Sequence, residues 1–185
     1  MEDLPTLRHI DSYLQGHPNM NTVPGVDMST GSLGQGISAA AGMAKGAKYL
    51  GKDSNVYTLL GDGEIAEGEV WEAMLFAAHY HLDNFCMIVD LNGLQIDGSN
   101  DEVMSLGDLP AKLRAFGFDF YEIDGHDLDA IEAALSAPVT AGKPKAILAH
   151  TVKGKGVSFM ENQVGWHGKA PNAEQREQAL KELED

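Results

Sequence analysis

Cysteine, basic side chains and long apolar runs are all scarce in this chain of 185 residues. The single cysteine, Cys86, cannot form an internal disulfide, and its place within an apolar run indicates a buried thiol of a cytoplasmic protein. No apolar stretch approaches the ~20 residues that a bilayer span needs, and the first residues lack the pattern of a signal peptide. We therefore expect a cytoplasmic protein that does not enter a membrane.

Positive charge is the second scarcity. The chain has 13 lysines and arginines against 28 aspartates and glutamates, which gives a formal net charge of −15. Such a chain repels a phosphate backbone, and its basic residues form no run, so we expect no nucleic-acid partner and no anionic membrane surface. An anionic ligand would need backbone N–H groups at a helix start, or a divalent cation, to bind here.

The order of the secondary structure elements predicts the fold. With 43% hydrophobic residues the chain can bury one sizeable core, and its length favours a single domain. Strand-like and helical segments alternate, which predicts a doubly wound α/β fold with a mostly parallel sheet and helices on both faces. We expect strands at 56–60, 85–91, 118–123 and 145–151, and helices at 4–14, 37–50, 67–81, 109–116, 128–136 and 174–183.

Polar residues follow two of these strands. Asp62 stands between two glycines after the strand at 56–60, and Asn92 follows the strand at 85–91. Ligands of open parallel sheets bind beyond the carboxyl ends of the strands, and adjacent strands would bring both tips together. One carboxylate and one amide oxygen suit Mg²⁺, which fills its other positions with water and phosphates. The alternative is a hairpin turn and ordinary loop residues, but the strand–turn–helix context favours the metal site.

A glycine-rich segment, residues 30–36, opens the helix expected at 37–50. Such a segment could bind a nucleotide, as in an NAD(P) oxidoreductase. Its glycine spacing is not G-x-G-x-x-G, and no clear strand precedes it, so this alternative is the weaker one.

Four segments resemble transketolase, a thiamine diphosphate (ThDP) enzyme. Residues 61–98 resemble the ThDP-binding motif, which begins with Gly-Asp-Gly and ends with Asn, and residues 29–44, 150–157 and 166–172 are similar to the same family in the same order. The resemblance covers the chain from about Leu4 onward. It implies the ThDP-binding fold and a diphosphate-binding domain that lacks the family's first segment.

The resemblance also implies how ThDP and Mg²⁺ are bound. Asp62, Asn92 and the backbone carbonyl of Leu94 match the Mg²⁺ ligands of the family, and Gly63 matches the glycine whose N–H meets the diphosphate.

Further residues match groups that line or close the family's active site. His17 matches a histidine near the reacting substrate, and Glu67 and Glu72 match glutamates of a network between the two active sites of a dimer. Taken alone, these glutamates could instead be the charged start of a helix. Gly31, Ser32 and Leu33 match the loop that lines the cofactor in the family. Lys153 and His167 match the two residues that close over it.

The implied activity is transfer of a two-carbon ketol unit from a ketose phosphate to an aldose phosphate, as in the pentose phosphate pathway. The chain contains no motif of the pyrimidine-binding domain that activates ThDP in the family. We therefore expect it to be inactive alone and to need a pyrimidine-binding C-terminal transketolase subunit, in a homodimer or heterotetramer. A catalytically silent binding or assembly module is the alternative.

Overall fold

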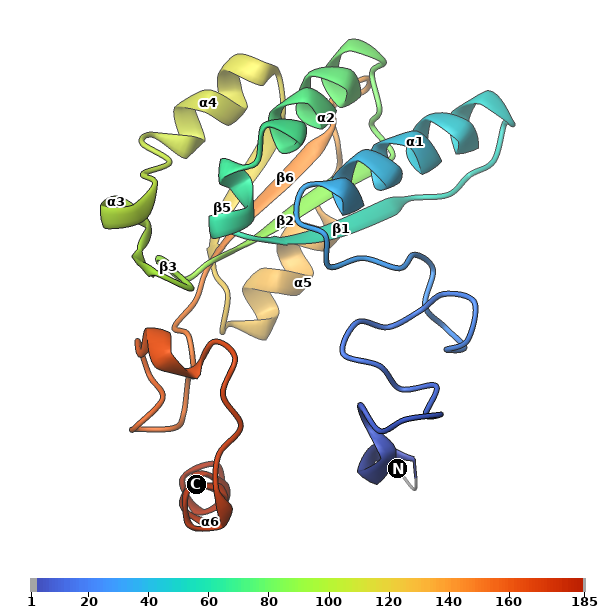
Figure 1. The fold of residues 1–185 in the computed structure, drawn as a ribbon. Coiled ribbons are helices and arrows are strands. Elements are labelled where there is room, and N and C mark those ends of the chain that lie inside the picture. The colour runs from blue at the N-terminus through green and yellow to red at the C-terminus, as the bar shows by residue number, and fades with distance from the viewer. Residues whose placement is uncertain (1–2, 185) are drawn as a thin grey trace.

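A parallel sheet organises the molecule (Figure 1). The structure, a computed structural model, describes residues 3–184. The sheet has four strands in the order β1–β2–β6–β5, and every neighbouring pair is parallel. The strands are β1 (Val56–Gly61), β2 (Phe85–Leu91), β5 (Asp119–Asp124) and β6 (Lys145–His150). The predicted doubly wound α/β fold is confirmed.

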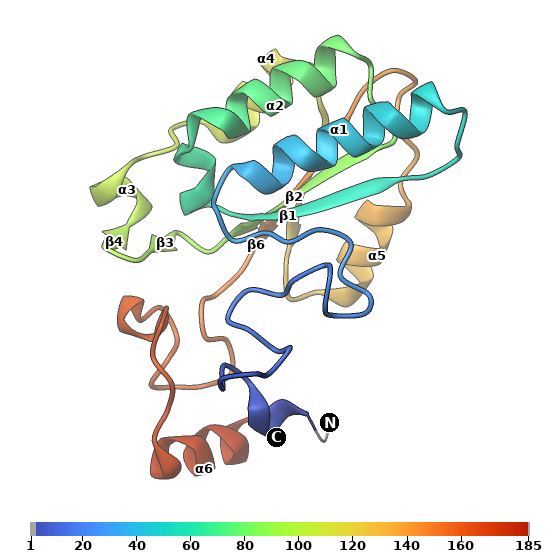
Figure 2. The same ribbon diagram turned by 45° about the vertical axis from the view of Figure 1, so that its right-hand side comes forward.

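Helices cover the two faces of the sheet unequally (Figures 1 and 2). Three of them, α1 (Gln35–Tyr49), α2 (Gly68–His79) and α4 (Leu109–Phe116), lie on one face. A single helix, α5 (Leu128–Ser136), lies on the other. The helices predicted in these regions are confirmed, with bounds that differ by two residues at most.

Local signals explain why α4 and α5 begin where the sequence predicts. The Asp108 side chain accepts a hydrogen bond from the N–H of Ala111 at the start of α4, and Gly117, with φ +85°, ends that helix. Asp127 caps α5 in the same way, accepting from Asp129 and Ala130. Aspartate caps and a left-handed glycine are strong boundary signals because they pair backbone groups that a helix end leaves free.

The main core lies under α1, α2 and α4. On β2, Phe85, Met87 and Val89 point into this core, and Leu148 of β6 lies beside them. The opposite face has a smaller core of Cys86, Ala134 and Ile147. Because α5 covers only part of that face, two apolar side chains of β1 remain exposed, Tyr57 at 55% and Leu59 at 70%.

Short elements follow the central strands at their carboxyl ends. A two-stranded antiparallel hairpin and a short capped helix come directly after β2, and no sequence pattern predicted the hairpin. The remaining elements are β3 (Leu94–Gln95), β4 (Gly98–Ser99), α3 (Asn100–Val103), α6 (Ala173–Glu182) and the 3₁₀ helices η1 (Leu4–Thr6), η2 (Gly63–Ala66) and η3 (Val164–Trp166).

The predicted helix over residues 4–14 is wrong. Only η1 forms there, and the chain then runs irregularly to α1 (Figure 1). Arg8 and Asp11 have φ values of +62° and +64°, in the left-handed region that a right-handed helix excludes. Within residues 3–184, no helix has the length and apolar character required to cross a bilayer.

Two leucines, Leu148 of β6 and Leu59 of β1, lie on opposite faces of the sheet and test this core. Leu148 is fully buried, so Leu148→Ala should lower the free energy of unfolding by about 2–5 kcal/mol. Leu59→Ala makes the same chemical change at an exposed position and should alter it by less than about 0.5 kcal/mol. Urea unfolding of both variants measures the difference. Equal losses would contradict this core, because Leu59 would then be buried in solution.

Candidate functional site

Asp62 joins the tips of two strands. Its side chain is 1% exposed and lies directly after β1. One carboxylate oxygen accepts the N–H of Gly63 at 2.8 Å, and the other accepts the N–H of Gly93, beyond the end of β2, at 2.5 Å. The parallel register pairs Gly61 with Asp90, so the two tips are neighbours, as the sequence predicted.

The Asp62 carboxylate has no cationic partner in the described part of the chain. The three salt bridges among residues 3–184 involve other carboxylates. A buried carboxylate is costly unless a cation or several hydrogen bonds compensate its charge. Two backbone N–H groups supply part of that compensation, and the arrangement therefore favours a cation at this tip.

The amide of Asn92 is held in one orientation. Its oxygen accepts the N–H of Leu94 at 3.1 Å, and its nitrogen donates to Asp90 at 3.3 Å. The Thr151 hydroxyl, beyond the end of β6, donates to the same Asp90 oxygen. Asp90 and Thr151 thus orient Asn92, a role that the sequence did not reveal because Thr151 lies on a different strand end.

The oxygen atoms that could coordinate a metal at this tip suit a hard cation. They are the Asp62 carboxylate and the Asn92 amide oxygen, with the backbone carbonyl of Leu94 two residues further along the chain. Residues 3–184 contain no cluster of three or more histidine, cysteine, aspartate or glutamate side chains that could hold a metal. Zinc sites use such clusters, whereas Mg²⁺ is usually held by one or two carboxylates together with phosphate oxygens. One carboxylate and one amide oxygen fit Mg²⁺, whose remaining positions water or other oxygen ligands would fill.

The hairpin after β2 supports the tip from one side. A Cβ at Gly63 would lie 2.9 Å from the Cβ of Gln95 in β3, so the close contact requires glycine. The Gln95 amide donates to the buried Asn100 at 2.9 Å, which fixes the Gln95 side chain against the start of α3. The Gly63 N–H, which the resemblance assigns to the diphosphate, here donates to Asp62.

The glycine-rich loop before α1 brings in His17. Gly31 has φ +121°, and a Cβ there would lie 2.2 Å from the His17 ring, so the ring rests directly on the Gly31 backbone. Three residues further on, Gly34 packs against Glu67, because its Cβ would lie 3.0 Å from the Cβ of Glu67. The structure therefore brings His17, the loop and Glu67 together. Glu72 lies on an exposed part of α2.

Lys153 and His167 lie on the segment that follows β6 at the carboxyl end of the sheet (Figure 1). Lys153 is partly buried and His167 is exposed. The indole N–H of Trp166, next to His167, donates to the carbonyl of Phe159 at 2.9 Å, which gives this segment internal order. No hydrogen bond or salt bridge within residues 3–184 joins either residue to the Asp62 tip, so their closing role stays a prediction.

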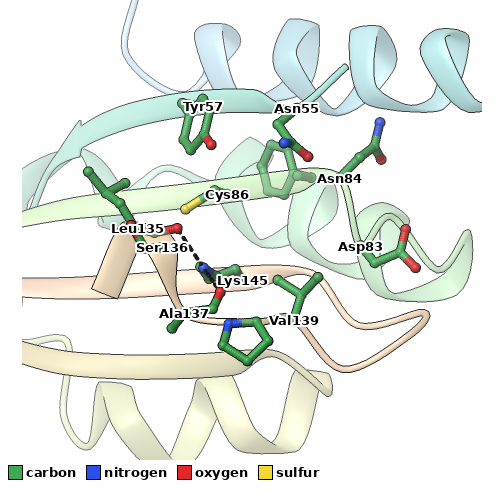
Figure 3. Close-up of a pocket in the computed structure, with 12 residues that line it drawn as sticks. Asn55, Tyr57, Asp83, Asn84, Cys86, Leu135, Ser136, Ala137, Val139 and Lys145 are labelled. Atoms are coloured by element: carbon green, nitrogen blue, oxygen red, sulfur yellow. Dashed lines mark hydrogen bonds between the residues drawn. The ribbon is translucent and has the colours of Figure 1, made fainter. Parts of the chain in front are cut away.

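A separate cavity of about 250 Å³ lies at the amino ends of the strands (Figure 3). Lys145 in its wall is buried, and its ammonium donates to the carbonyls of Ala134, Leu135 and Ala137 at the end of α5. Because a lysine has three N–H groups, none is left for an anionic ligand. This cavity is therefore a poor candidate for the functional site.

A scan against protein families matches residues 1–183 to the model described as transketolase, thiamine diphosphate binding domain. The structure is similar to a crystal structure of transketolase from Campylobacter jejuni, with a TM-score of 0.92 and 34% identity over 99% of this chain and 30% of that one.

Two curated relatives differ in length. The chain is 43% identical to one of the subunits of the apulose-4-phosphate transketolase of Actinobacillus succinogenes, over 98% of this chain and 66% of the relative. It is 41% identical to human transketolase, over 98% of this chain and 29% of that protein. The chain thus spans about two thirds of the first relative and less than a third of the second.

The Cys86 thiol should be unreactive in the folded protein. Burial raises its pKa to about 11, and the positive charge of Lys145 opposes this only in part. At pH 8 the native thiol is therefore protonated, and iodoacetamide should alkylate it far more slowly than in the unfolded chain. Because the raised pKa favours the protonated form, the folded state should lose stability as the pH rises toward 11. Equal alkylation rates in native and unfolded protein would contradict this burial.

Proposed function

Because the chain belongs to the transketolase family through its thiamine diphosphate-binding domain, we propose that it is the diphosphate-binding component of a transketolase. Its reaction would move a two-carbon ketol unit from a ketose phosphate to an aldose phosphate. The observation that carries this proposal is the buried Asp62 carboxylate, which lies beside Asn92 and has no basic side chain to balance it among the described salt bridges.

In this proposal the strand tips hold Mg²⁺ and the diphosphate. Asp62, Asn92 and the Leu94 carbonyl are the protein ligands of the ion. The Gly63 N–H, which donates to Asp62 in the structure, would donate to the diphosphate once the ion binds the Asp62 carboxylate. Bound ThDP supplies the electron sink that the ketol transfer needs, while the protein supplies orientation and charge. Asp90 and Thr151 hold the nitrogen side of the Asn92 amide, so its oxygen would be the atom that binds the ion.

The substrate side of the site is proposed to lie near the glycine-rich loop. Gly31, Ser32 and Leu33 line the cofactor, and His17, which rests on Gly31, offers ring nitrogens to substrate hydroxyl groups. Glu67 and Glu72 belong to a hydrogen-bonded network that reaches a second active site in a dimer. The groups that close over the bound cofactor are Lys153 and His167.

A partner chain completes the proposed active site. One relative is named as a transketolase subunit, and the chain spans only part of each relative. We propose that a pyrimidine-binding transketolase subunit holds the other end of ThDP, in a homodimer or heterotetramer. The present chain then forms one diphosphate-binding domain of that assembly.

Removal of Asp62 tests the metal site. Asp62→Ala should weaken Mg²⁺-dependent ThDP binding by more than about a hundredfold. Mutation of residues that only hydrogen-bond to metal ligands already lowers metal affinity by about 10- to 100-fold, and Asp62 is proposed to bind the ion directly. Titration calorimetry of the assembled enzyme measures the affinity, and thermal unfolding confirms that the variant is folded.

Asp129→Ala is the matched control, because this exposed carboxylate lies on α5, away from the Asp62 tip. It removes one negative charge and should leave ThDP affinity unchanged. If both variants bind ThDP as the wild type does, the assignment of Asp62 to the metal fails.

Turnover should depend on the partner. The chain alone, supplied with ThDP and Mg²⁺, should show no ketol transfer, because the aminopyrimidine end of the cofactor has no activating group from this chain. Addition of a matched pyrimidine-binding subunit should produce activity in a coupled assay of ketose phosphate cleavage. Robust turnover by the chain alone would refute the two-component proposal. No ThDP binding in any mixture would instead favour a catalytically silent module.

A further inference from the structure

The Glu64 side chain connects two parts of the molecule that lie far apart in sequence. It lies in the 3₁₀ helix η2, two residues after the N-cap residue Asp62, and it is partly buried. One carboxylate oxygen accepts the N–H of Gly34 at 2.9 Å, at the end of the glycine-rich loop. The other accepts the N–H of Gly61 at 3.3 Å, at the end of β1.

The start of α1 lacks the groups that normally stabilise a helix N-terminus. Its N-cap residue is Gly34, with φ +85° and no capping side chain, and its first turn contains no acidic residue. Free N–H groups and the positive end of the helix dipole favour a carboxylate at such a position. Glu64 supplies that carboxylate from another element.

The N–H of Gly61 is free for a different reason. β1 is an edge strand with β2 as its only neighbour in the described sheet. The N–H of Asp62 donates across to the carbonyl of Asp90 on β2. Because successive N–H groups of a strand point to opposite sides, the N–H of Gly61 points to the open edge. There the Glu64 carboxylate is its hydrogen-bond partner.

We propose that Glu64 is a positioning residue. It fixes the position of the cofactor-lining loop, residues 31–34, relative to the metal-binding tip at Asp62. This inference rests on the function proposed above. The carboxylate is suited to the task because both oxygens are acceptors and both partners are backbone N–H groups. Glutamine keeps only one acceptor oxygen, and alanine keeps none.

The sequence alone makes Glu64 look like one more acid at a charged helix start. In that simpler role it would stabilise η2 without affecting the loop. The two roles differ in what happens at Gly34, whose N–H has no partner other than Glu64 among the described hydrogen bonds.

Amide hydrogen exchange measured by NMR tests the contact in the chain as it is, without cofactor. In Glu64→Ala the Gly34 amide should exchange about tenfold faster or more, since a hydrogen bond to a charged group is lost. Glu64→Gln should fall between alanine and the wild type. Glu132→Ala, which removes an exposed carboxylate from α5 on the other face, should leave Gly34 unchanged. The buried amides of β6 report that each variant is folded.

Calorimetric titration of the assembled enzyme with ThDP, at saturating Mg²⁺, tests the consequence. Glu64→Ala should bind ThDP about tenfold more weakly, and Glu132→Ala should bind as the wild type does. If the alanine variant fails to fold, the glutamine variant carries the same comparison.

Unchanged exchange at Gly34 in a folded Glu64→Ala variant would overturn the proposal. Faster exchange with unchanged ThDP affinity would overturn the positioning role alone. A wild-type assembly that does not bind ThDP would instead overturn the proposed function on which this role rests.

Discussion

The Asp62 carboxylate imposes the constraint on which the rest of the site depends. It is almost completely buried, it accepts two backbone N–H groups from two different strand tips, and it forms no salt bridge with a described residue. A charge in that position links the ends of β1 and β2, and the two N–H groups compensate it only in part. The proposed Mg²⁺ would balance this buried charge, and phosphate oxygens would complete its coordination.

Neighbouring residues fix the side chains and the backbone at that tip. Asp90 and Thr151 orient the Asn92 amide, while the β3–β4 hairpin packs against Gly63 through Gln95. These contacts come from three different strand ends, which meet because all strands of the sheet run in the same direction. The parallel topology is therefore what turns separate polar residues into one site.

Much of this arrangement could be predicted from the sequence where the signals are local. β2, α4 and α5 begin and end at the predicted residues, because an apolar run, aspartate caps and Gly117 mark their ends. The adjacency of Asp62 and Asn92 followed from parallel strands that are consecutive in the chain.

Other features depend on contacts that no local pattern encodes. Apolar residues recur through residues 4–14 at spacings that suggest a helix, but Ile10 is 93% exposed. An apolar stripe that packs against nothing adds little to helix stability, so the pattern was misleading there. Similarly, Glu64 and Thr151 owe their roles to partners far away in sequence, which only the folded chain brings into reach.

The most direct test of the central claim replaces Mg²⁺ with Mn²⁺ and examines the ion by electron–nuclear double resonance in the presence of ThDP. The protein would carry aspartate labelled with ¹³C at the side-chain carboxylate. If Asp62 and the diphosphate share the ion, the spectrum should show hyperfine coupling both to ¹³C of an aspartate carboxylate and to ³¹P of the cofactor. Coupling to ³¹P without any coupling to ¹³C would contradict the account, because the ion would then be held without Asp62.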